Sequence, residues 1–201
     1  SVVVSDENGC EFPIVIVMTQ PEQGVEIEET HSDYTGQGVS CFGDNDGFID
    51  VTVTGGAGGY IYEWSAVDPN GQTITVPVNT DGDITGLVAG TYTLIATDSN
   101  GCSNTEIVEI TQNEELTASE TASDFTGQGI SCFGEDDGSI NLETNGGTGV
   151  YEYAWSAVDP DGQTITVPAA DANGNITGLV AGTYSVVVSD ENGCEFPIEI
   201  V

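Results

Sequence analysis

Hydrophobic and polar residues alternate with a period of two along most of this chain. In the segment 49–54, IDVTVT, apolar residues fall on one face and polar residues on the other, which is typical of a strand with one buried face. GGAGG at 55–59 then turns the chain, and Tyr60, Tyr62 and Trp64 share one face of the next strand. Because aromatic residues at strand period usually belong to a core, we expect this stripe to be buried.

Short turn signatures separate the predicted strands. DPNG at 68–71 and DPDG at 159–162 are typical of tight turns, because Pro presets φ and Gly accepts a positive φ. SNGC at 99–102 and ENGC at 191–194 predict the hairpin that leads into a last strand. Sustained helical periodicity is absent from the sequence. The pattern predicts an all-β chain of immunoglobulin-like, or PKD-like, β-sandwiches, each with about seven short strands in two packed sheets.

An internal repeat divides the chain. SAVDPNGQTITVP at 65–77 returns at 156–168 with one substitution, and residues 1–17 return at 185–201 with one substitution. We therefore expect the C-terminal strands of a preceding repeat at 1–20 and two β-sandwich repeats at 21–112 and 113–201. The linkers at 20–23 and 112–115 are too short for free swivelling, so the repeats are expected to stack end to end. A chain that opens and closes within a repeat implies further copies on both sides.

The charge balance narrows the classes of partner and reaction. The sequence has 34 Asp and Glu, no Lys or Arg and one His, a formal net charge of -34. Such a surface repels phosphate backbones and anionic membranes and attracts divalent cations or cationic surfaces, so nucleic acid is not an expected partner. The chain lacks a Schiff-base amine and a guanidinium clamp for phosphate. No apolar run is long enough to predict a membrane span in this fragment.

Four acidic loops carry candidate metal ligands. DNDG at 44–47, DGD at 81–83, EDDG at 135–138 and DANGN at 171–175 place oxygen atoms around a Gly, which suits Ca²⁺ with its roughly six to eight oxygen ligands. The alternative, which we favour for any single loop, is an ordinary Asx-type turn. The candidate ligands are Asp44, Asp46, Asp81, Asp83, Glu135, Asp136, Asp137, Asp171, Asn173 and Asn175.

Catalytic candidates are few. His31 aligns with Ala122 of the other repeat, and no neighbouring motif supplies the nucleophile and carboxylate of a triad. Carboxylate pairs of the glycosidase kind have no distinctive spacing among so many acids. Because the chain repeats its features evenly, whereas a catalytic site is asymmetric, we expect no enzyme.

Five cysteines recur at repeat positions: Cys10, Cys41, Cys102, Cys132 and Cys194. In a chain of extracellular character they predict disulfides. A pairing within each repeat would join Cys41 to Cys102 and Cys132 to Cys194. The strand between the first two, however, separates them by roughly 20 Å, against about 4.4–6.8 Å between bonded Cα atoms. In a head-to-tail stack Cys41 instead meets Cys194, so we prefer this inter-repeat bond and keep the pairing within repeats, sequential pairing and free thiols as alternatives.

The combined motifs resemble a known family. SCFGDNDGFIDVTVTGGAGGYIYEW at 40–64 and GLVAGTYTLIATDSNGC at 86–102 resemble the SprB-type repeat of large surface adhesins of gliding Bacteroidetes, and the second repeat matches equally well. The resemblance covers essentially the whole chain. It implies a segment of a long extracellular filament at a bacterial cell surface, used for attachment or gliding. DPNGQTITVP at 68–77 is longer than the turn usual in that family and is expected to form an extra edge hairpin.

Two functions are therefore compared. The first is a structural stalk, which needs no cofactor and whose partners are the neighbouring repeats of the same chain and identical filaments. The alternative is a calcium-dependent module that binds a glycan or a surface. Even repetition, short linkers and the absence of basic residues favour the stalk.

Overall fold

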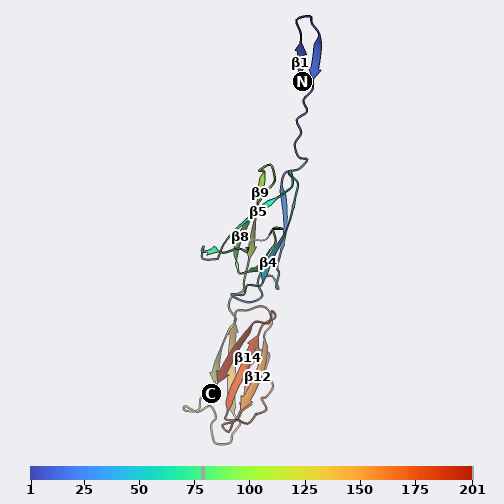
Figure 1. Ribbon diagram of the computed structural model, residues 1–201. Coiled ribbons are helices and arrows are strands. Elements are labelled where there is room, and N and C mark those ends of the chain that lie inside the picture. Colours follow the sequence, from blue (N-terminus) through green and yellow to red (C-terminus); the bar gives the residue numbers. More distant parts are fainter. Residues whose placement is uncertain (78–79, 201) are drawn as a thin grey trace.

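A computed structural model describes residues 1–77 and 80–200 of the protein. Every regular element in these ranges is a β-strand, which confirms the predicted all-β class. The strands form an N-terminal hairpin, a first unit and a second unit, which follow one another along an elongated molecule (Figure 1). The described part of the chain holds no helix with the length and apolar character that crossing a bilayer takes.

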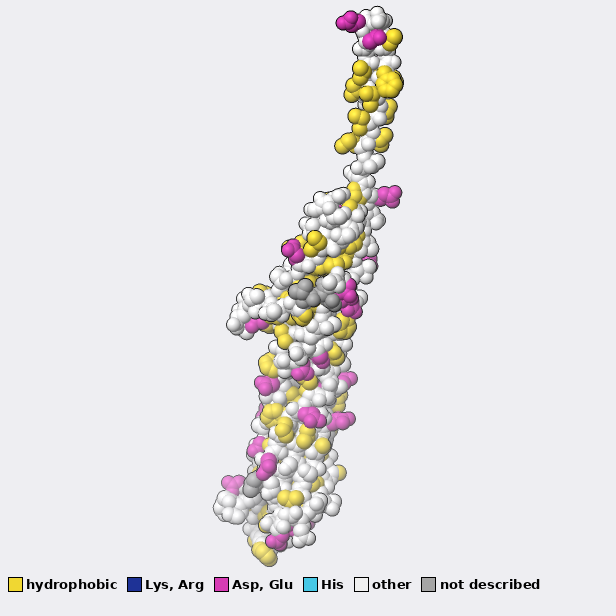
Figure 2. Space-filling view, in the orientation of Figure 1, with side chains coloured by type: hydrophobic (Ala, Val, Ile, Leu, Met, Phe, Trp, Pro, Cys, Tyr) yellow, Lys and Arg dark blue, Asp and Glu magenta, His cyan; other side chains and the backbone are white. Residues whose placement is uncertain are grey.

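The N-terminal hairpin pairs β1 (Val2–Ser5) with β2 (Glu11–Ile14) in antiparallel register. Its apolar side chains are exposed and form the yellow band below the acidic tip at the top of Figure 2. Val2 and Val4 are 55% and 53% exposed, whereas the residues at the same repeat positions in the second unit, Val186 and Val188, are 1% and 0% exposed. The hairpin thus has the sequence of the last two strands of a repeat without the sandwich that would cover it.

The first unit is a sandwich of two antiparallel sheets, with strand orders β3-β4-β7 and β6-β5-β8-β9. The strands are β3 (Glu26–His31), β4 (Gly47–Thr54), β5 (Ile61–Val67), β6 (Thr73–Ile74), β7 (Ile84–Leu87), β8 (Gly90–Thr97) and β9 (Ser103–Ile110). Seven strands in two sheets, counted over the described residues, agree with the prediction. The extra edge hairpin is present, because β6 pairs with the edge of β5.

The second unit repeats this arrangement with strand orders β10-β11-β13 and β12-β14-β15. The strands are β10 (Thr117–Ala122), β11 (Gly138–Asn145), β12 (Glu152–Val158), β13 (Ile176–Leu179), β14 (Thr183–Ser189) and β15 (Glu195–Ile200). The counterpart of β6 is reduced to a single bridge between Val158 and Thr164. The local sequence is almost the same in both units, and nothing in it explains this difference.

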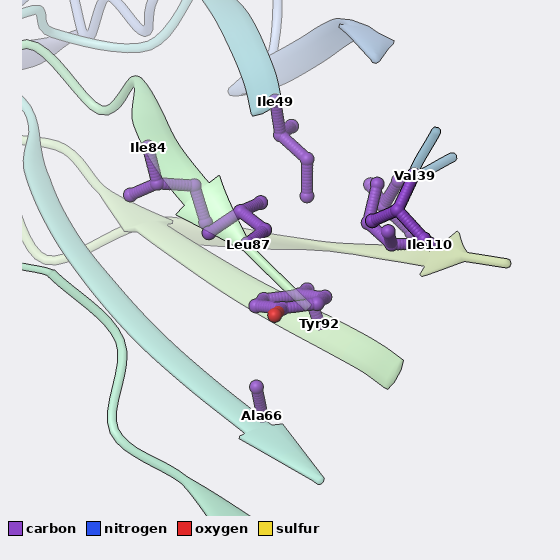
Figure 3. Close-up of a cluster of buried hydrophobic side chains, with 8 residues drawn as sticks. Val39, Ile49, Ala66, Ile84, Leu87, Tyr92 and Ile110 are labelled. Atoms are coloured by element: carbon purple, nitrogen blue, oxygen red, sulfur yellow. The ribbon is translucent and has the colours of Figure 1, made fainter. Parts of the chain in front are cut away.

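Both cores lie between the sheets. In the first unit Ile49 and Ile84 from one sheet meet Tyr92 and Ile110 from the other (Figure 3). Tyr92 is fully buried, and its hydroxyl donates to the carbonyl oxygen of Val88 at 2.9 Å. This link is the tyrosine corner of immunoglobulin-like sandwiches, and it explains the repeated AGTY motif.

The aromatic stripe is buried only in part. Tyr60, Tyr62 and Trp64 are half-buried, and Trp64 packs against the edge of the core. The Trp64 indole N–H donates to the carbonyl oxygen of Gly82 at 2.9 Å. The stripe therefore faces inward, as predicted, but loops rather than a second layer of strands cover it.

Candidate functional site

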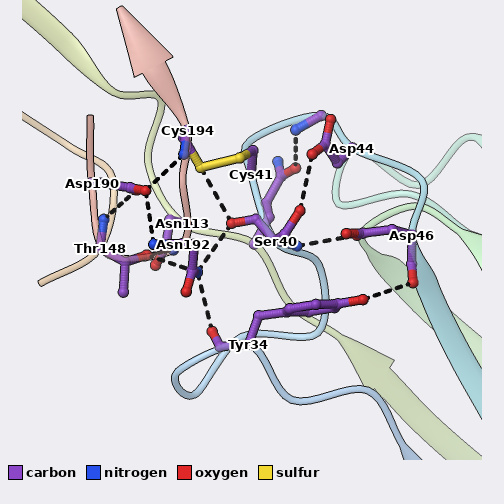
Figure 4. Close-up of a disulfide and its surroundings, with 12 residues drawn as sticks. Tyr34, Ser40, Cys41, Asp44, Asp46, Asn113, Thr148, Asp190, Asn192 and Cys194 are labelled. Carbon is purple, nitrogen blue, oxygen red and sulfur yellow. Dashed lines mark hydrogen bonds between the residues drawn. A yellow bond between two sulfur atoms is a disulfide. The ribbon is translucent and has the colours of Figure 1, made fainter. Parts of the chain in front are cut away.

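The two units meet pole to pole at a junction built from three segments (Figure 4). We call residues 32–46 of the first unit the receiving loop and residues 190–194 of the second unit the docking hairpin. The third segment is the linker, residues 111–115. The junction combines a covalent bond with hydrogen bonds between the units.

A disulfide joins Cys41 of the receiving loop to Cys194 of the docking hairpin. Their Cα atoms are 5.7 Å apart, although 153 residues separate the cysteines in the sequence. This is the inter-repeat pairing preferred from the sequence. Cys10, Cys102 and Cys132, all within the described residues, carry exposed free thiols.

The side chain of Asn192 bonds across the junction with both of its polar atoms. Its Oδ1 accepts a hydrogen bond from the Thr35 hydroxyl at 2.9 Å. Its Nδ2 donates to the carbonyl oxygens of Ser40, at 3.1 Å, and Tyr34, at 3.3 Å. Sequence reasoning missed this residue, although a signal was present: each hairpin of the chain has Asn two residues before its Cys, at positions 8, 100 and 192.

Asp190 shapes the docking hairpin. Its Oδ1 accepts the backbone N–H groups of Asn192, at 3.0 Å, and Cys194, at 2.9 Å. Its Oδ2 accepts the N–H of Thr148 at 2.8 Å, and the residue is only 6% exposed. A short carboxylate that binds backbone N–H groups two and four residues later fixes a hairpin turn. The hairpin therefore holds its shape through its own unit.

The counterpart in the first unit, Asp98, is buried in the same arrangement. It accepts the N–H groups of Ala57 at 2.9 Å, Cys102 at 2.8 Å and Asn100 at 2.9 Å. The hydrogen bonds from Ala57 and Cys102 hold the pKa of Asp98 below its ordinary value, against the opposing effect of burial. An ionised carboxylate is the form that accepts all three donors.

The receiving loop also holds its own shape. The Ser32 hydroxyl, which is buried, donates to the carbonyl oxygen of Gly38 at 2.5 Å and accepts the N–H of Phe48 at 3.1 Å. Asp33 accepts the N–H of Gly36 at 2.6 Å. Between them Thr35 adopts a φ of 51°, a conformation that non-glycine residues rarely take. This backbone turn places the Thr35 hydroxyl at the junction.

The linker is bonded to both units. Thr111 accepts the N–H groups of Gly38 and Val39 at 3.0 and 3.1 Å. On the other side, the Asn113 amide donates to the Thr148 hydroxyl. A linker held at both ends leaves little freedom for one unit to rotate against the other.

Most of the candidate metal ligands that make hydrogen bonds accept them from backbone N–H groups. Asp46 and Asp137 accept the N–H groups of Ser40 and Ser131 at 3.1 and 3.0 Å. Asp171 accepts the N–H groups of Asn173 and Asn175 at 2.8 and 2.9 Å. The remaining contacts are those of Asp44 with the Ser40 hydroxyl, Asp83 with the Val51 N–H and Asn175 Oδ1 with the Leu142 N–H. Asp81, Glu135 and Asp136 are exposed in their loops.

The hydrogen bonds raise the acidity of several of these carboxyl groups. The bond from the Ser131 hydroxyl lowers the pKa of Asp137, and the bond from the Asn175 amide lowers that of Asp171. Over residues 1–77 and 80–200, no three or more His, Cys, Asp or Glu side chains form a group that could hold a metal ion. Calcium binding stays a prediction.

The single histidine lies at the end of β3, directly before the receiving loop. Its Nδ1 is 3.0 Å from Oε2 of Glu29, and the side chain is exposed. A His–carboxylate pair on a sheet surface is an ordinary surface contact.

A pocket of about 340 Å³ opens at the far pole of the second unit, beside Gly129, Gly138 and Tyr184. In the first unit Ile110 and Thr111 pack against Gly38, the counterpart of Gly129. The last strand of the second unit, β15, ends at Ile200, which corresponds to Val108. The pocket therefore marks the place where Ile110 lies in the first unit.

Taken together, two antiparallel sandwiches with tyrosine corners and a covalent junction define a tandem immunoglobulin-like repeat protein. The sequence profile described as "SprB repeat" matches residues 37–69 and 128–160. The predicted resemblance to the SprB repeat is thus confirmed at both places. The first match begins in the receiving loop and ends after β5, and it includes Cys41. The second match covers the equivalent segment of the second unit, ends after β12 and includes Cys132.

Three solved structures are similar in outline. The N-terminal eight Ig domains of Down Syndrome Cell Adhesion Molecule isoform 1.30.30 have 12% identity and a TM-score of 0.44, covering 90% of this chain and 24% of that one. A tetra-tandem repeat from the extending region of a large adhesion protein has 16% identity and a TM-score of 0.32, with coverages of 98% and 53%. Murine CEACAM1b has 18% identity and a TM-score of 0.36, with coverages of 82% and 93%.

This chain spans about a quarter of the first of these structures and about half of the second. With TM-scores below 0.5, none of the three supports a conclusion about function. A search of curated proteins finds no match.

Proposed function

We propose that this chain is a structural segment of a long extracellular filament or adhesin stalk at a bacterial cell surface, used for attachment or gliding. The observation that carries the proposal is the Cys41–Cys194 disulfide between neighbouring units. A bond placed between repeats fixes their relative position, which serves a stalk. A bond within each repeat would stabilise a module without joining it to the next.

The composition supports an exposed location. Disulfides persist in oxidising compartments and at cell surfaces. The absence of Lys and Arg removes every trypsin-type cleavage site from this segment. Figure 2 shows acidic side chains spread over the visible face of both units, so parallel filaments would repel one another unless cations lie between them.

The proposal is tested by measuring the shape of the chain in solution. Small-angle X-ray scattering of the oxidised protein should give the pair-distance distribution of one elongated shape, and the Cys41→Ser/Cys194→Ser variant should give the distribution of a more compact and more varied ensemble. The Cys102→Ser/Cys132→Ser variant is the matched control, because it removes two cysteines that are free in this chain. We call the Cys41–Cys194 disulfide the clasp. Equal distributions for all three proteins would contradict its proposed role.

Attachment is tested separately. Beads coated with the oxidised chain should not adhere to glycan arrays or charged surfaces beyond the level of a non-specific acidic protein, because the stalk proposal assigns adhesion to other parts of the filament. Strong glycan binding that requires millimolar calcium would instead support the alternative module. An unchanged melting temperature on adding calcium or a chelator would count against calcium binding.

A further inference from the structure

We propose that the free receiving loop at the far pole of the second unit, residues 123–137, binds the docking hairpin of another repeat and forms a disulfide through Cys132. The matching hairpins on this chain are 98–102 in the first unit and 6–10 in the N-terminal hairpin. The same junction would then recur at each step of an array. This inference deepens the proposed function and rests on it, and it names the partner as a repeat of the same kind.

The free receiving loop has the sequence of the occupied one. TGQGISCFG at 126–134 differs from TGQGVSCFG at 35–43 at one position. It is also built in the same way: the Ser123 hydroxyl donates to the carbonyl oxygen of Gly129 at 2.7 Å, and Asp124 accepts the N–H of Gly127 at 2.5 Å. Thr126 has a φ of 55°, against 51° for Thr35. The rare backbone conformation is therefore present before any partner is bound.

The free hairpins have the geometry of the docked one. Asp6 accepts the N–H groups of Asn8 and Cys10 at 2.9 and 2.8 Å. Asp98 makes the equivalent bonds in the first unit. The Asn side chain and the Cys thiol, the two groups that reach across the junction at 190–194, are left on the outer side of each hairpin.

The junction residues of the occupied site are less exposed to solvent than their counterparts in the free hairpin and the free receiving loop. Asn192 and Cys194 are half-buried at the junction, whereas Asn100 and Cys102 are exposed. On the receiving side, Ser40 and Cys41 are half-buried and Ser131 and Cys132 are exposed. Phe133, next to Cys132, is the most exposed large apolar side chain described, at 109%. Its counterpart at the occupied junction, Phe42, is 49% exposed, so the same residue types are less exposed where a hairpin is docked than where none is.

The bond would form by thiol–disulfide exchange. A small-molecule disulfide such as oxidised glutathione reacts with the Cys132 thiolate to give a mixed disulfide and one reduced thiol. The Cys102 thiolate of a second chain then attacks the Cys132 sulfur, forms the interchain bond and releases the second reduced thiol. The two protons lost by the Cys132 and Cys102 thiols are taken up by the two released thiolates of the small molecule, whose disulfide takes up the two electrons.

The test uses two variants of the whole chain that cannot react with themselves through the proposed junction. The first, Cys132→Ser, keeps only free hairpin thiols. The second, Cys10→Ser/Cys102→Ser, keeps only the thiol of the free receiving loop. Both retain the Cys41–Cys194 bond, which peptide mapping with an acid-specific protease verifies. The reaction with oxidised glutathione is run at about 0.5 M NaCl, because salt screens the repulsion between the acidic chains.

We expect the mixture of the two variants to form covalent dimers at least about tenfold faster than either variant alone. Adding Asn8→Ala and Asn100→Ala to the first variant should slow the reaction by about tenfold, because each docked hairpin loses its cross-junction hydrogen bonds. Equal rates for the mixture and for the receiving-loop variant alone, or no effect of the Asn substitutions, would overturn the inference. Neither of these results would alter the scattering test of the Cys41–Cys194 stalk.

Discussion

Removing the Cys41–Cys194 bond should destabilise the second unit by several kcal/mol. Cys41 lies beside the start of the linker, because Gly43 donates to the Gln112 side chain at 3.0 Å. When the second unit alone unfolds, the disulfide therefore ties both ends of residues 113–194 to the folded first unit. Closing a loop of about 80 residues is worth roughly 4.5 kcal/mol in the chain-entropy relation, and measured values are typically about 2–4 kcal/mol.

We expect the Cys41→Ser/Cys194→Ser variant to lose about 3–4 kcal/mol of unfolding free energy in the second unit. For a unit of this size the melting temperature should fall by roughly 15–30 °C. The first unit should lose a similar amount, since the same bond closes residues 41–112 when that unit unfolds alone.

The two tryptophans allow each unit to be followed separately. Trp64 lies in the first unit and Trp155 in the second, so urea unfolding by fluorescence in a Trp64→Phe background reports the second unit. The control is Cys102→Ser/Cys132→Ser, which should stay within about 0.5 kcal/mol of the parent. A loss below about 1 kcal/mol in the clasp variant, or an equal loss in the control, would refute the reasoning.

Four further predictions concern the units themselves. Tyr92→Phe should cost about 1–2 kcal/mol of unfolding free energy by removing the tyrosine-corner hydrogen bond, as measured by urea unfolding. Gly147→Ala should cost roughly 2–3 kcal/mol of unfolding free energy, because this residue has a φ of 64° and a Cβ would lie 2.7 Å from the buried carboxylate of Asp190. Gly162→Ala is the control that measures the cost of the positive φ alone, because Gly162 has a φ of 79° and open space around it. Burial raises the pKa of Tyr92 and Tyr184, so their contribution to the stability of the fold is complete below about pH 10 and is lost above it. The absorbance of ionised tyrosine at 295 nm should therefore rise together with unfolding, and the chain has no Lys or Arg whose titration would add to the effect. The lowered pKa of Asp98 makes its contribution complete above about pH 4 and lost at lower pH, so Asp98→Asn should flatten the acid limb of the stability profile.

Side-chain periodicity was enough to predict the strands, and strand length together with head-to-tail stacking was enough to prefer the pairing of Cys41 with Cys194 over the alternatives. The period of two in 49–54 reflects which side chains face the core, and it was visible because β4 is buried on one face only. The preference for Cys41 with Cys194 came from strand length, since a rigid strand separates two poles by a distance that a disulfide cannot span.

What could not be predicted depends on contacts between distant segments. Asn192 is an ordinary turn residue until the neighbouring unit places Thr35 and Ser40 against it. The half-burial of Tyr62 depends on a loop folding over it, where Gly82 has a φ of 95° and leaves no room for a Cβ. For the acidic loops the sequence favoured ordinary turns over calcium sites, but it could not show which backbone N–H groups each carboxylate accepts.

The clasp also decides where tension passes when such a filament is pulled. Force applied at the two ends of this chain enters Cys41, crosses to Cys194 and leaves, so residues 42–193 are shielded from it. If each junction were closed in this way, the covalent route from one hairpin cysteine to the next receiving-loop cysteine, such as Cys102 to Cys132, would contain about 30 residues, or roughly 100 Å of extended chain for every two repeats. Without the bonds, the double repeat of about 184 residues could lengthen to roughly 600 Å. A clasped filament would behave as a tether that transmits a pull directly, and it would lengthen by unfolding only after reduction.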